Sequence, residues 1–239
     1  MPLQILLREP ATNLTFPELD PPEHRMRRRV LAPAYTREAA RHDDATIRAI
    51  TRQVLGPLVE RGTFDAFGDY AHVVAGRFAA TKAGVPLADA DALRTDISRA
   101  FRREPGQRGT SPANQEAMLA VFTYLHQLVA DGRRRPDHAT GWGSANRDEA
   151  EFPAADRFDL HRRPKRSLVF GHGQHQCIGE HVGMRMGTAI LEELVAAIDD
   201  YEVDADGVHR RYGEFLKGYD RLPISVTPRT RTGTRGRNP

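Results

Sequence analysis

Cysteine is nearly absent from this chain of 239 residues, which contains a single thiol, Cys177. A single cysteine excludes an intramolecular disulfide, and it excludes any metal site that needs two thiolates from the same chain. Lysine is scarce too, since only Lys82, Lys165 and Lys217 occur among the 35 basic residues. The role of Cys177 therefore depends on which groups the fold places around it.

Long hydrophobic runs are also absent. No stretch approaches the roughly 18 apolar residues of a membrane-spanning helix, and the N-terminal sequence lacks the pattern of a signal peptide. We therefore expect a cytoplasmic protein with no membrane partner. Hydrophobic residues make up 39% of the chain, which is enough for a buried core and predicts a single domain over residues 1–228.

Positive charge is in excess only at the C-terminus. The net charge is +3, but residues 229–239 hold four arginines and no acidic residue, so the rest of the chain carries 31 basic and 32 acidic residues. We predict that this tail is disordered. The near-neutral remainder argues against a nucleic-acid partner, and the tail and the run RMRRR are the only features that favour one.

The spacing of apolar residues predicts a mainly α fold with minor β structure. Helices are expected over residues 37–61, 70–83, 89–101 and 112–131, and from Cys177 or Ile178 to about Ile198. Strands are expected at 201–203 and 222–228, and residues 138–176 should be irregular. The predicted domain thus has a helical part (20–137), a loop followed by a helix (138–200) and C-terminal strands (201–228).

Residues 170–179 read FGHGQHQCIG, a glycine-rich loop that leads into the last predicted helix. Backbone N–H groups at a helix N-terminus lower the pKa of a cysteine, so Cys177 is expected to be partly thiolate. Gly171, Gly173 and Gly179 leave room for a large flat group or allow a sharp turn. A buried, inert cysteine at a tight turn is the alternative that these residues leave open.

This loop resembles the haem-binding loop of the cytochrome P450 family in its bacterial form, F-G-x-G-x-H-x-C-x-G. The matching residues are Phe170, Gly171, Gly173, His175, Cys177 and Gly179, and Ile178 stands between the last two. The resemblance implies that Cys177 is the axial thiolate ligand of the iron of haem b. It also implies that His175 contacts a haem propionate and that Phe170 packs beside the sulfur.

Two further segments are similar to the family in the same order along the chain. In DPPEHRMRRRVLAPAYT, the resemblance implies that His24 and Arg28 lie on one helix face and hold a propionate. The second segment, GSANRDEAEFPAADRFDLHR, resembles the stretch that precedes the haem loop. Together with GTFDAFGDYA, these segments extend the resemblance over nearly all of residues 7–228.

Other parts of the family pattern are missing. Between His138 and Ala139 the family has a long central helix, with an acid and alcohol pair that delivers protons, and a second helix with Glu-x-x-Arg. The only Glu-x-x-Arg here is Glu38 to Arg41, far upstream. The resemblance thus implies a truncated, internally deleted cytochrome P450 fold with exposed apolar surface, no identifiable catalytic residue and impaired oxygen activation. A smaller departure follows the cysteine, where Val182, Gly183 and Met184 replace Leu-Ala-Arg.

The implied activity is that of a haem-thiolate monooxygenase, which inserts one oxygen atom of O2 into a small organic substrate. The implied electron donor is a ferredoxin or a flavoprotein, and basic residues at 25–29 and 162–166 could meet an acidic ferredoxin. The alternatives are an inactive haem-binding protein or a degraded gene product. A zinc site at His172, His175, Cys177 and His181 is a further, weaker hypothesis.

Overall fold

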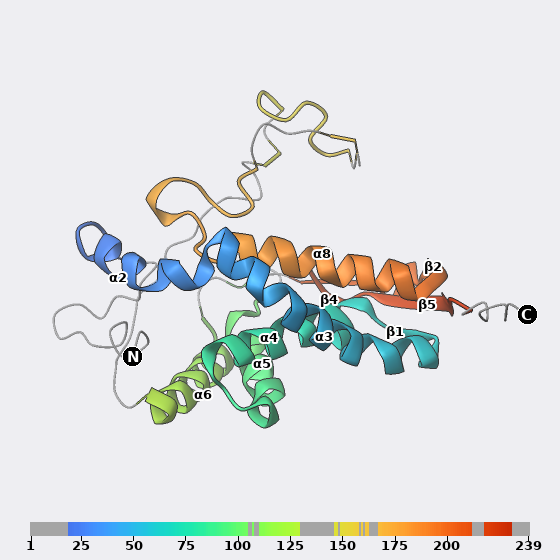
Figure 1. The fold of residues 1–239 in the computed structure, drawn as a ribbon, viewed down its shortest axis with the longest axis horizontal. Helices are drawn as coiled ribbons and strands as arrows, with labels where there is room; N and C mark the ends of the chain where they lie inside the picture. The colour runs from blue at the N-terminus through green and yellow to red at the C-terminus, as the bar shows by residue number, and fades with distance from the viewer. Residues whose placement is uncertain are drawn as a thin grey trace, which may run out of the picture. The chain divides into compact units, whose positions relative to one another are not determined.

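The structure is a computed structural model that describes residues 19–104, 107, 110–129, 146–147, 149–157, 159, 161–162, 167–211 and 218–230. Helices predominate in these ranges and the strands are short, which confirms the predicted mainly α class with minor β structure (Figure 1). Within the same ranges, no helix combines the length and the apolar character needed to cross a membrane.

Contacts within the chain define two compact units, and each is described by itself below. The first comprises Met1–Asp43, Ala92–Arg185 and Arg211–Gly218, and the second comprises Asp44–Asp91, Met186–Arg210 and Tyr219–Pro239. The single domain over residues 1–228 and the disordered tail over 229–239 stay predictions. Of that tail, the structure describes only residues 229 and 230.

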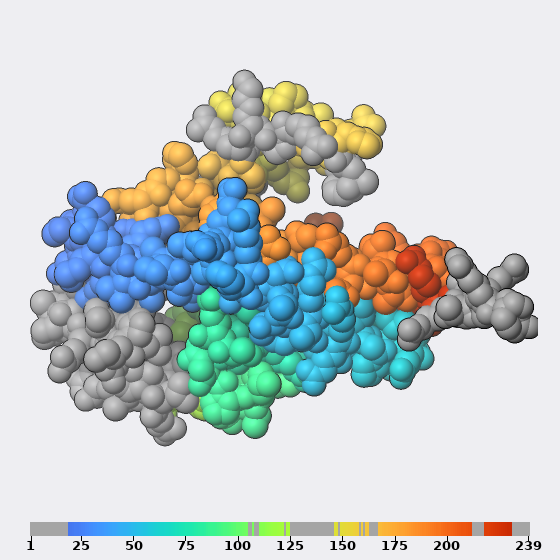
Figure 2. Space-filling model, viewed as in Figure 1, coloured from blue at the N-terminus to red at the C-terminus, as the bar shows by residue number. Residues whose placement is uncertain are grey.

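Helix α2 (Glu23–Leu31) and a 3-10 turn, η2 (Ala32–Tyr35), open the described part of the chain. The α2 segment lies at the surface of the space-filling view, where it is blue (Figure 2). His24 and Arg27 are nevertheless buried. The helix therefore has one face toward the protein and another toward solvent.

Helix α3 (Arg37–Arg61) has the boundaries predicted from the sequence. Thr36 caps it as expected, since its hydroxyl accepts a hydrogen bond from the N–H of Ala39 at 3.1 Å. Gly62 follows the helix with a φ of 77°, a left-handed conformation that glycine adopts at little cost. The predicted apolar stripe is buried, with each residue at most 9% exposed: Ile47, Ile50, Val54 and Leu58.

The next two helices differ slightly from the prediction. Helix α4 (His72–Ala83) begins later than Tyr70, because a π-helical turn, η3 (Ala66–Ala71), precedes it. Helix α5 (Leu87–Phe101) begins two residues before Asp89. Apolar spacing does not distinguish a π-helical turn from an α-helix over six residues, so these boundaries could not be read from the sequence.

Helix α6 (Pro112–Val129) begins at the predicted residue. The hydroxyl of Ser111 accepts a hydrogen bond from the N–H of Asn114 at 3.2 Å, which satisfies a donor of the first turn. The predicted end of this helix at Asp131 lies outside the described residues. Most of residues 138–176 lie outside them too, and the described remainder consists of turns, bends and a short 3-10 turn, η4 (Gly173–His175).

Helix α8 (Glu180–Ala197) begins later than predicted and ends one residue earlier. Ile198, expected on the buried stripe of this helix, is instead the first residue of strand β2 (Ile198–Val203) and is 5% exposed. The strand prevails because Ile198 pairs with Pro228 of β5 (Pro223–Pro228). A partner strand that lies far away in the sequence decided the end of the helix.

The second unit contains an antiparallel sheet in the order β1-β5-β2, where β1 is Thr63–Asp65. Phe64 lies opposite Ile224, and both are nearly fully buried, so the sheet turns this pair toward the core. Strand β5 confirms the strand predicted over 222–228. A 3-10 turn, η5 (Ala205–Gly207), and the pair β3 (His209–Arg211) and β4 (Gly218–Arg221) follow β2 in the chain.

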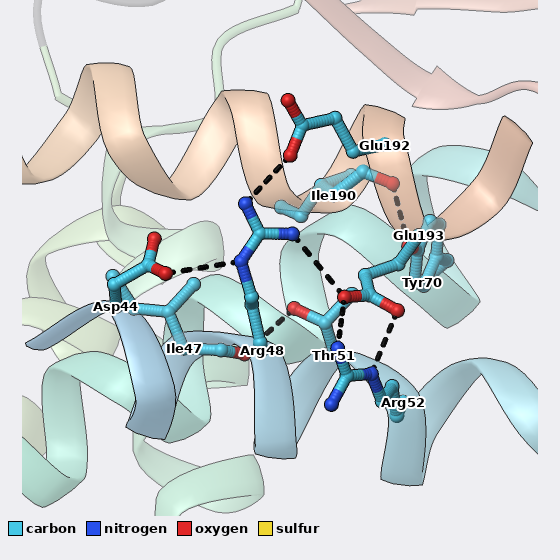
Figure 3. A network of polar contacts seen from close by, with 9 residues as sticks. All are labelled: Asp44, Ile47, Arg48, Thr51, Arg52, Tyr70, Ile190, Glu192 and Glu193. Carbon is cyan, nitrogen blue, oxygen red and sulfur yellow. Dashed lines mark hydrogen bonds and ion pairs between the residues drawn. The ribbon is translucent and has the colours of Figure 1, made fainter. Parts of the chain in front are cut away.

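Charged side chains join α3 and α8 within the second unit (Figure 3). Glu193 accepts two hydrogen bonds from Arg52, each at 2.8 Å, and one from Arg48 at 3.2 Å. Arg48 also binds Asp44 and Glu192. The hydrogen bonds from Arg52, and then those from Arg48, hold the pKa of Glu193 below its usual value. This carboxylate therefore stays ionised and anchors α8 to α3.

Tyr70 makes the buried polar contact beside this network (Figure 3). Its side chain is almost fully buried, and its hydroxyl donates a hydrogen bond to the carbonyl of Ile190 at 2.7 Å. Burial raises the pKa of the Tyr70 phenol well above its usual value, so the group stays protonated and can donate.

We predict that Tyr70→Phe lowers the free energy of unfolding by about 1 kcal/mol, because it removes this hydrogen bond and keeps the ring. Urea unfolding followed by circular dichroism measures the change. Tyr201→Phe is the matched control, since Tyr201 is 62% exposed. Equal effects of the two substitutions would contradict a stabilising hydrogen bond from Tyr70 to the carbonyl of Ile190.

Candidate functional site

The loop before α8 takes its shape from two glycines. Gly171 and Gly173 have φ angles of 74° and 72°, which other residues rarely adopt. The N–H of Gly171 donates to the carbonyl of Leu168 at 2.9 Å, and the N–H of Gln176 donates to that of Gly173 at 3.1 Å. Both glycines are therefore needed for the turns that bring the chain to Cys177.

Cys177 lies where this loop ends, and it is exposed. Its N–H donates a hydrogen bond to the carbonyl of Phe170 at 2.7 Å, which closes the loop. The prediction that α8 begins near Cys177 or Ile178 was wrong by two or three residues, since the helix starts at Glu180 and Cys177 lies in the irregular stretch before it. The alternative of a buried cysteine is wrong as well, because Cys177 is exposed.

Two other glycines set the space around these residues. A Cβ atom at Gly179 would lie 3.8 Å from the sulfur of Cys177, so the glycine keeps side-chain atoms away from this side of the thiol. A Cβ atom at Gly183 would lie 3.3 Å from the Cε1 atom of Phe170. The ring of Phe170 thus packs on the first turns of α8, a contact that the sequence did not reveal.

Helix α2 brings two predicted residues to the same unit as the loop. His24 is 1% exposed, and its ring lies 4.2 Å from that of His175, centroid to centroid, with an angle of 37° between the planes. Arg28 follows one turn after His24, and its charge acts on that imidazole. His24 and His175 are thus neighbours although they lie 151 positions apart in the sequence, and the contact of His24, Arg28 and His175 with a haem propionate stays a prediction.

The segment before the loop is held by one arginine. The guanidinium of Arg162 donates hydrogen bonds to the carbonyls of Pro153, Ala154 and Arg157, at 2.6 to 2.9 Å. Arg162 was predicted to belong to a basic surface for a partner, but its donors are used within its own segment. The other basic residues of that predicted surface, at 163, 165 and 166, lie outside the described residues.

Asn146 is a residue for which the sequence analysis proposed no role. Its side-chain oxygen accepts a hydrogen bond from the N–H of Leu168 at 2.9 Å and ties residue 146 to the start of the loop. The signal was present in the sequence, because asparagine in an irregular segment commonly binds backbone groups. A partner 22 residues away could not be identified without the fold.

The structure gives no support to a zinc site. Among the residues it describes, no three or more His, Cys, Asp or Glu side chains lie close enough together to hold a metal ion. The ring of His175 instead lies beside that of His24 on α2, in a tilted arrangement. The only Glu-x-x-Arg, Glu38 to Arg41, lies exposed in the first turns of α3.

The environment of His24 disfavours its protonated form. Burial lowers the pKa of His24 most, the charges of His175 and Arg28 lower it further, and Asp20 raises it. The unfolded chain therefore binds a proton more readily than the folded chain does. Stability attributable to His24 is complete above the ordinary histidine pKa of about 6.5 and is lost as the pH falls below it.

We predict that the free energy of unfolding of the haem-free protein decreases between pH 7.5 and pH 5.5, and that His24→Gln makes this decrease smaller. Urea unfolding at a series of pH values measures both slopes. His209→Gln is the control, because His209 is an exposed histidine on β3. An unchanged slope for His24→Gln would show that other groups carry the pH dependence.

Comparisons with known proteins identify the relatives of this chain. No family model matches the sequence. Cytochrome P450 NovI of Streptomyces niveus is 34% identical over 133 residues, which cover 51% of this chain and 32% of that protein. Beta-dihydromenaquinone-9 omega-hydroxylase of Mycobacterium tuberculosis is 41% identical over 88 residues, which cover 37% of this chain and 18% of that protein. The matched segments span about a third or less of these relatives.

Solved structures share the fold. CYP105P1, in its complex with filipin I, superimposes with a TM-score of 0.77 and 16% identity, over 94% of this chain and 82% of that chain. The cytochrome P450 OxyD, involved in the biosynthesis of vancomycin-type antibiotics, gives a TM-score of 0.70 and 18% identity, over 89% of this chain and 79% of that chain. The sequence relatives and the solved structures agree, so this chain has the cytochrome P450 fold and is similar in sequence to part of proteins named cytochrome P450s.

Proposed function

We propose that this chain is a haem-thiolate protein of the monooxygenase type that holds haem through Cys177. The observation that carries the proposal is the exposed thiol at the end of a loop closed by the hydrogen bond from Cys177 to Phe170. A haem iron with a thiolate ligand supplies the chemistry by which one oxygen atom of O2 enters a small organic substrate.

The residues present fit haem in two respects. Cys177 is exposed, and Gly179 keeps side-chain atoms away from its sulfur, which leaves room for a flat macrocycle. His24, His175 and Arg28 belong to the same unit, where the Arg28 guanidinium and the imidazole N–H groups are donors that suit the negative propionates. In this proposal Cys177 ligates the iron and these three residues hold the carboxylates. Ile178, Gly171 and Gly173 shape the loop.

A second candidate function is haem binding without oxygenation. It is favoured by the sequence, which has no recognisable acid and alcohol pair to deliver protons. The two candidates share the haem site and differ in turnover. If haem binds, oxidation of a small organic substrate with an electron donor present supports the first, and haem binding without oxidation supports the second. The cytoplasmic location stays a prediction.

We predict that the chain, expressed and supplied with haemin, forms a reduced carbon monoxide complex with the red-shifted Soret band of a thiolate ligand. Cys177→Ala should remove that band, because no other thiol is present. His172→Ala is the control, since His172 is an exposed loop residue with no proposed contact to haem. His175→Ala should weaken haem binding and keep the thiolate band.

Two results would contradict the proposal. A folded protein that takes up no haem would show that the loop no longer binds it. A red-shifted band that persists in Cys177→Ala would show that another group ligates the iron. The ultraviolet circular dichroism of each variant establishes that it is folded.

The proposed electron donor is an acidic ferredoxin or flavoprotein, and the solvent face of α2 is the proposed contact. Arg25 and Arg29 are exposed one turn apart on this helix, and Met26 beside them is 59% exposed. Arg27 is buried and Arg162 is occupied within its own segment, so neither is available in the same way. Exposed charged residues such as Arg25 and Arg29 commonly form the rim of a transient protein interface.

We predict that Arg25→Glu with Arg29→Glu weakens binding of an acidic bacterial ferredoxin several-fold at low ionic strength, and that added salt reduces the difference. Surface plasmon resonance measures the affinity with or without bound haem. Arg41→Glu is the control, because Arg41 is an exposed arginine of α3 outside the proposed contact. An equal loss in the control would indicate an effect of net charge alone.

A further inference from the structure

Gly183 lies in the first turns of α8, next to the ring of Phe170. A Cβ atom at this position would lie 3.3 Å from Cε1 and 3.4 Å from Cζ of that ring. Contacts this short require the neighbour to move by a few tenths of an ångström. The N–H of Gly183 donates to the carbonyl of Gly179 at 2.8 Å, so the glycine is part of the helix and cannot easily retreat.

Glycine inside a helix is normally unfavourable, because it gains conformational freedom in the unfolded chain. A glycine that persists there usually has a packing reason. Gly187, one turn later in α8, provides the contrast, since a Cβ atom added there would meet nothing within 4 Å. Of these two glycines in one helix, only Gly183 is in close contact with the loop.

Phe170 connects the contact with Gly183 to Cys177. Its ring packs on Gly183, and its carbonyl accepts the 2.7 Å hydrogen bond from the N–H of Cys177. If the ring of Phe170 is displaced from α8, either its side chain rotates or its backbone moves with it. If the backbone moves, the hydrogen bond from Cys177 to the Phe170 carbonyl changes as well.

We propose that Gly183 is a positioning residue for Cys177. The absence of a side chain at 183 lets the ring of Phe170 pack directly on α8, and the Phe170 carbonyl then sets the position of the Cys177 backbone. The consequence for iron ligation rests on the proposed function. The mechanical connection from Gly183 to Cys177 concerns the haem-free chain and can be measured there.

The test compares Gly183→Ala with Gly187→Ala in the full chain. Both substitutions improve helix propensity to the same degree, so they differ only in what the new methyl group meets. Gly187→Ala should raise the melting temperature by a few degrees, and Gly183→Ala should raise it less or lower it. The same pair of variants then tests the connection to Cys177.

The reaction of Cys177 with an aromatic disulfide reagent is the direct readout. Because Cys177 is the only cysteine, the rate reports this one residue. We expect Gly183→Ala to change the rate about threefold or more and Gly187→Ala to leave it nearly unchanged, since thiol reactivity follows the local environment. In the haem-loaded protein, Gly183→Ala alone should shift the Soret band of the reduced carbon monoxide complex.

A double-mutant cycle shows whether Phe170 transmits the effect. Leucine has no atoms at the ring positions that approach residue 183, so in a Phe170→Leu background the added methyl group should no longer alter the thiol rate. Equal thiol rates in Gly183→Ala and Gly187→Ala would overturn the proposal. An undiminished effect of Gly183→Ala in the Phe170→Leu background would overturn it as well.

Failure of this inference can be distinguished from failure of the proposed function. If the chain takes up no haem, the thiol rates and melting temperatures still decide whether Gly183 positions Cys177. If haem binds through Cys177 and the two alanine variants behave alike, the haem site stands and the positioning role of Gly183 is wrong.

Discussion

The hydrogen bond from the N–H of Cys177 to the carbonyl of Phe170, at 2.7 Å, is the constraint on which the site depends. It closes a loop of eight residues that contains two positive φ angles, at Gly171 and Gly173. Without it, the loop would have many conformations and the sulfur would have no fixed direction. The bond also joins the cysteine to the residue whose ring packs on α8.

The structure shows two different ways of holding α8. In the second unit, Glu193 and the carbonyl of Ile190 bind Arg52 and Tyr70, so charge-assisted and buried hydrogen bonds secure the helix. In the first unit, the contact is the packing of Phe170 on Gly183, which needs space and no polar group. A hydrogen bond is weakened when a small shift changes its angle. Close packing is disturbed when a small shift changes the distance between the atoms in contact.

The residues of the proposed haem site are present in this chain, and the proton-delivering pair expected from the resemblance is not. Cys177, His175, His24 and Arg28 lie within one compact unit, and no acid and alcohol pair was found in the sequence. Leu191 and Val195 of α8 are each 63% exposed, which agrees with the expectation of exposed apolar surface. Binding and turnover are separable in such a chain, because they depend on different segments.

The sequence by itself determined most of the local elements, and it indicated the residues of the proposed site. Thr36, Gly62 and the apolar stripe predicted α3 without error, because caps and periodicity are local properties. The glycine pattern around Cys177 indicated the loop for the same reason. The tertiary structure alone decided the end of α8 at Ile198, the contact of His24 with His175 and the place of Phe170 on Gly183. Each of these features depends on a partner distant in the sequence or on the space left by a missing side chain. The spacing of residues along the chain reveals neither the partner nor the space.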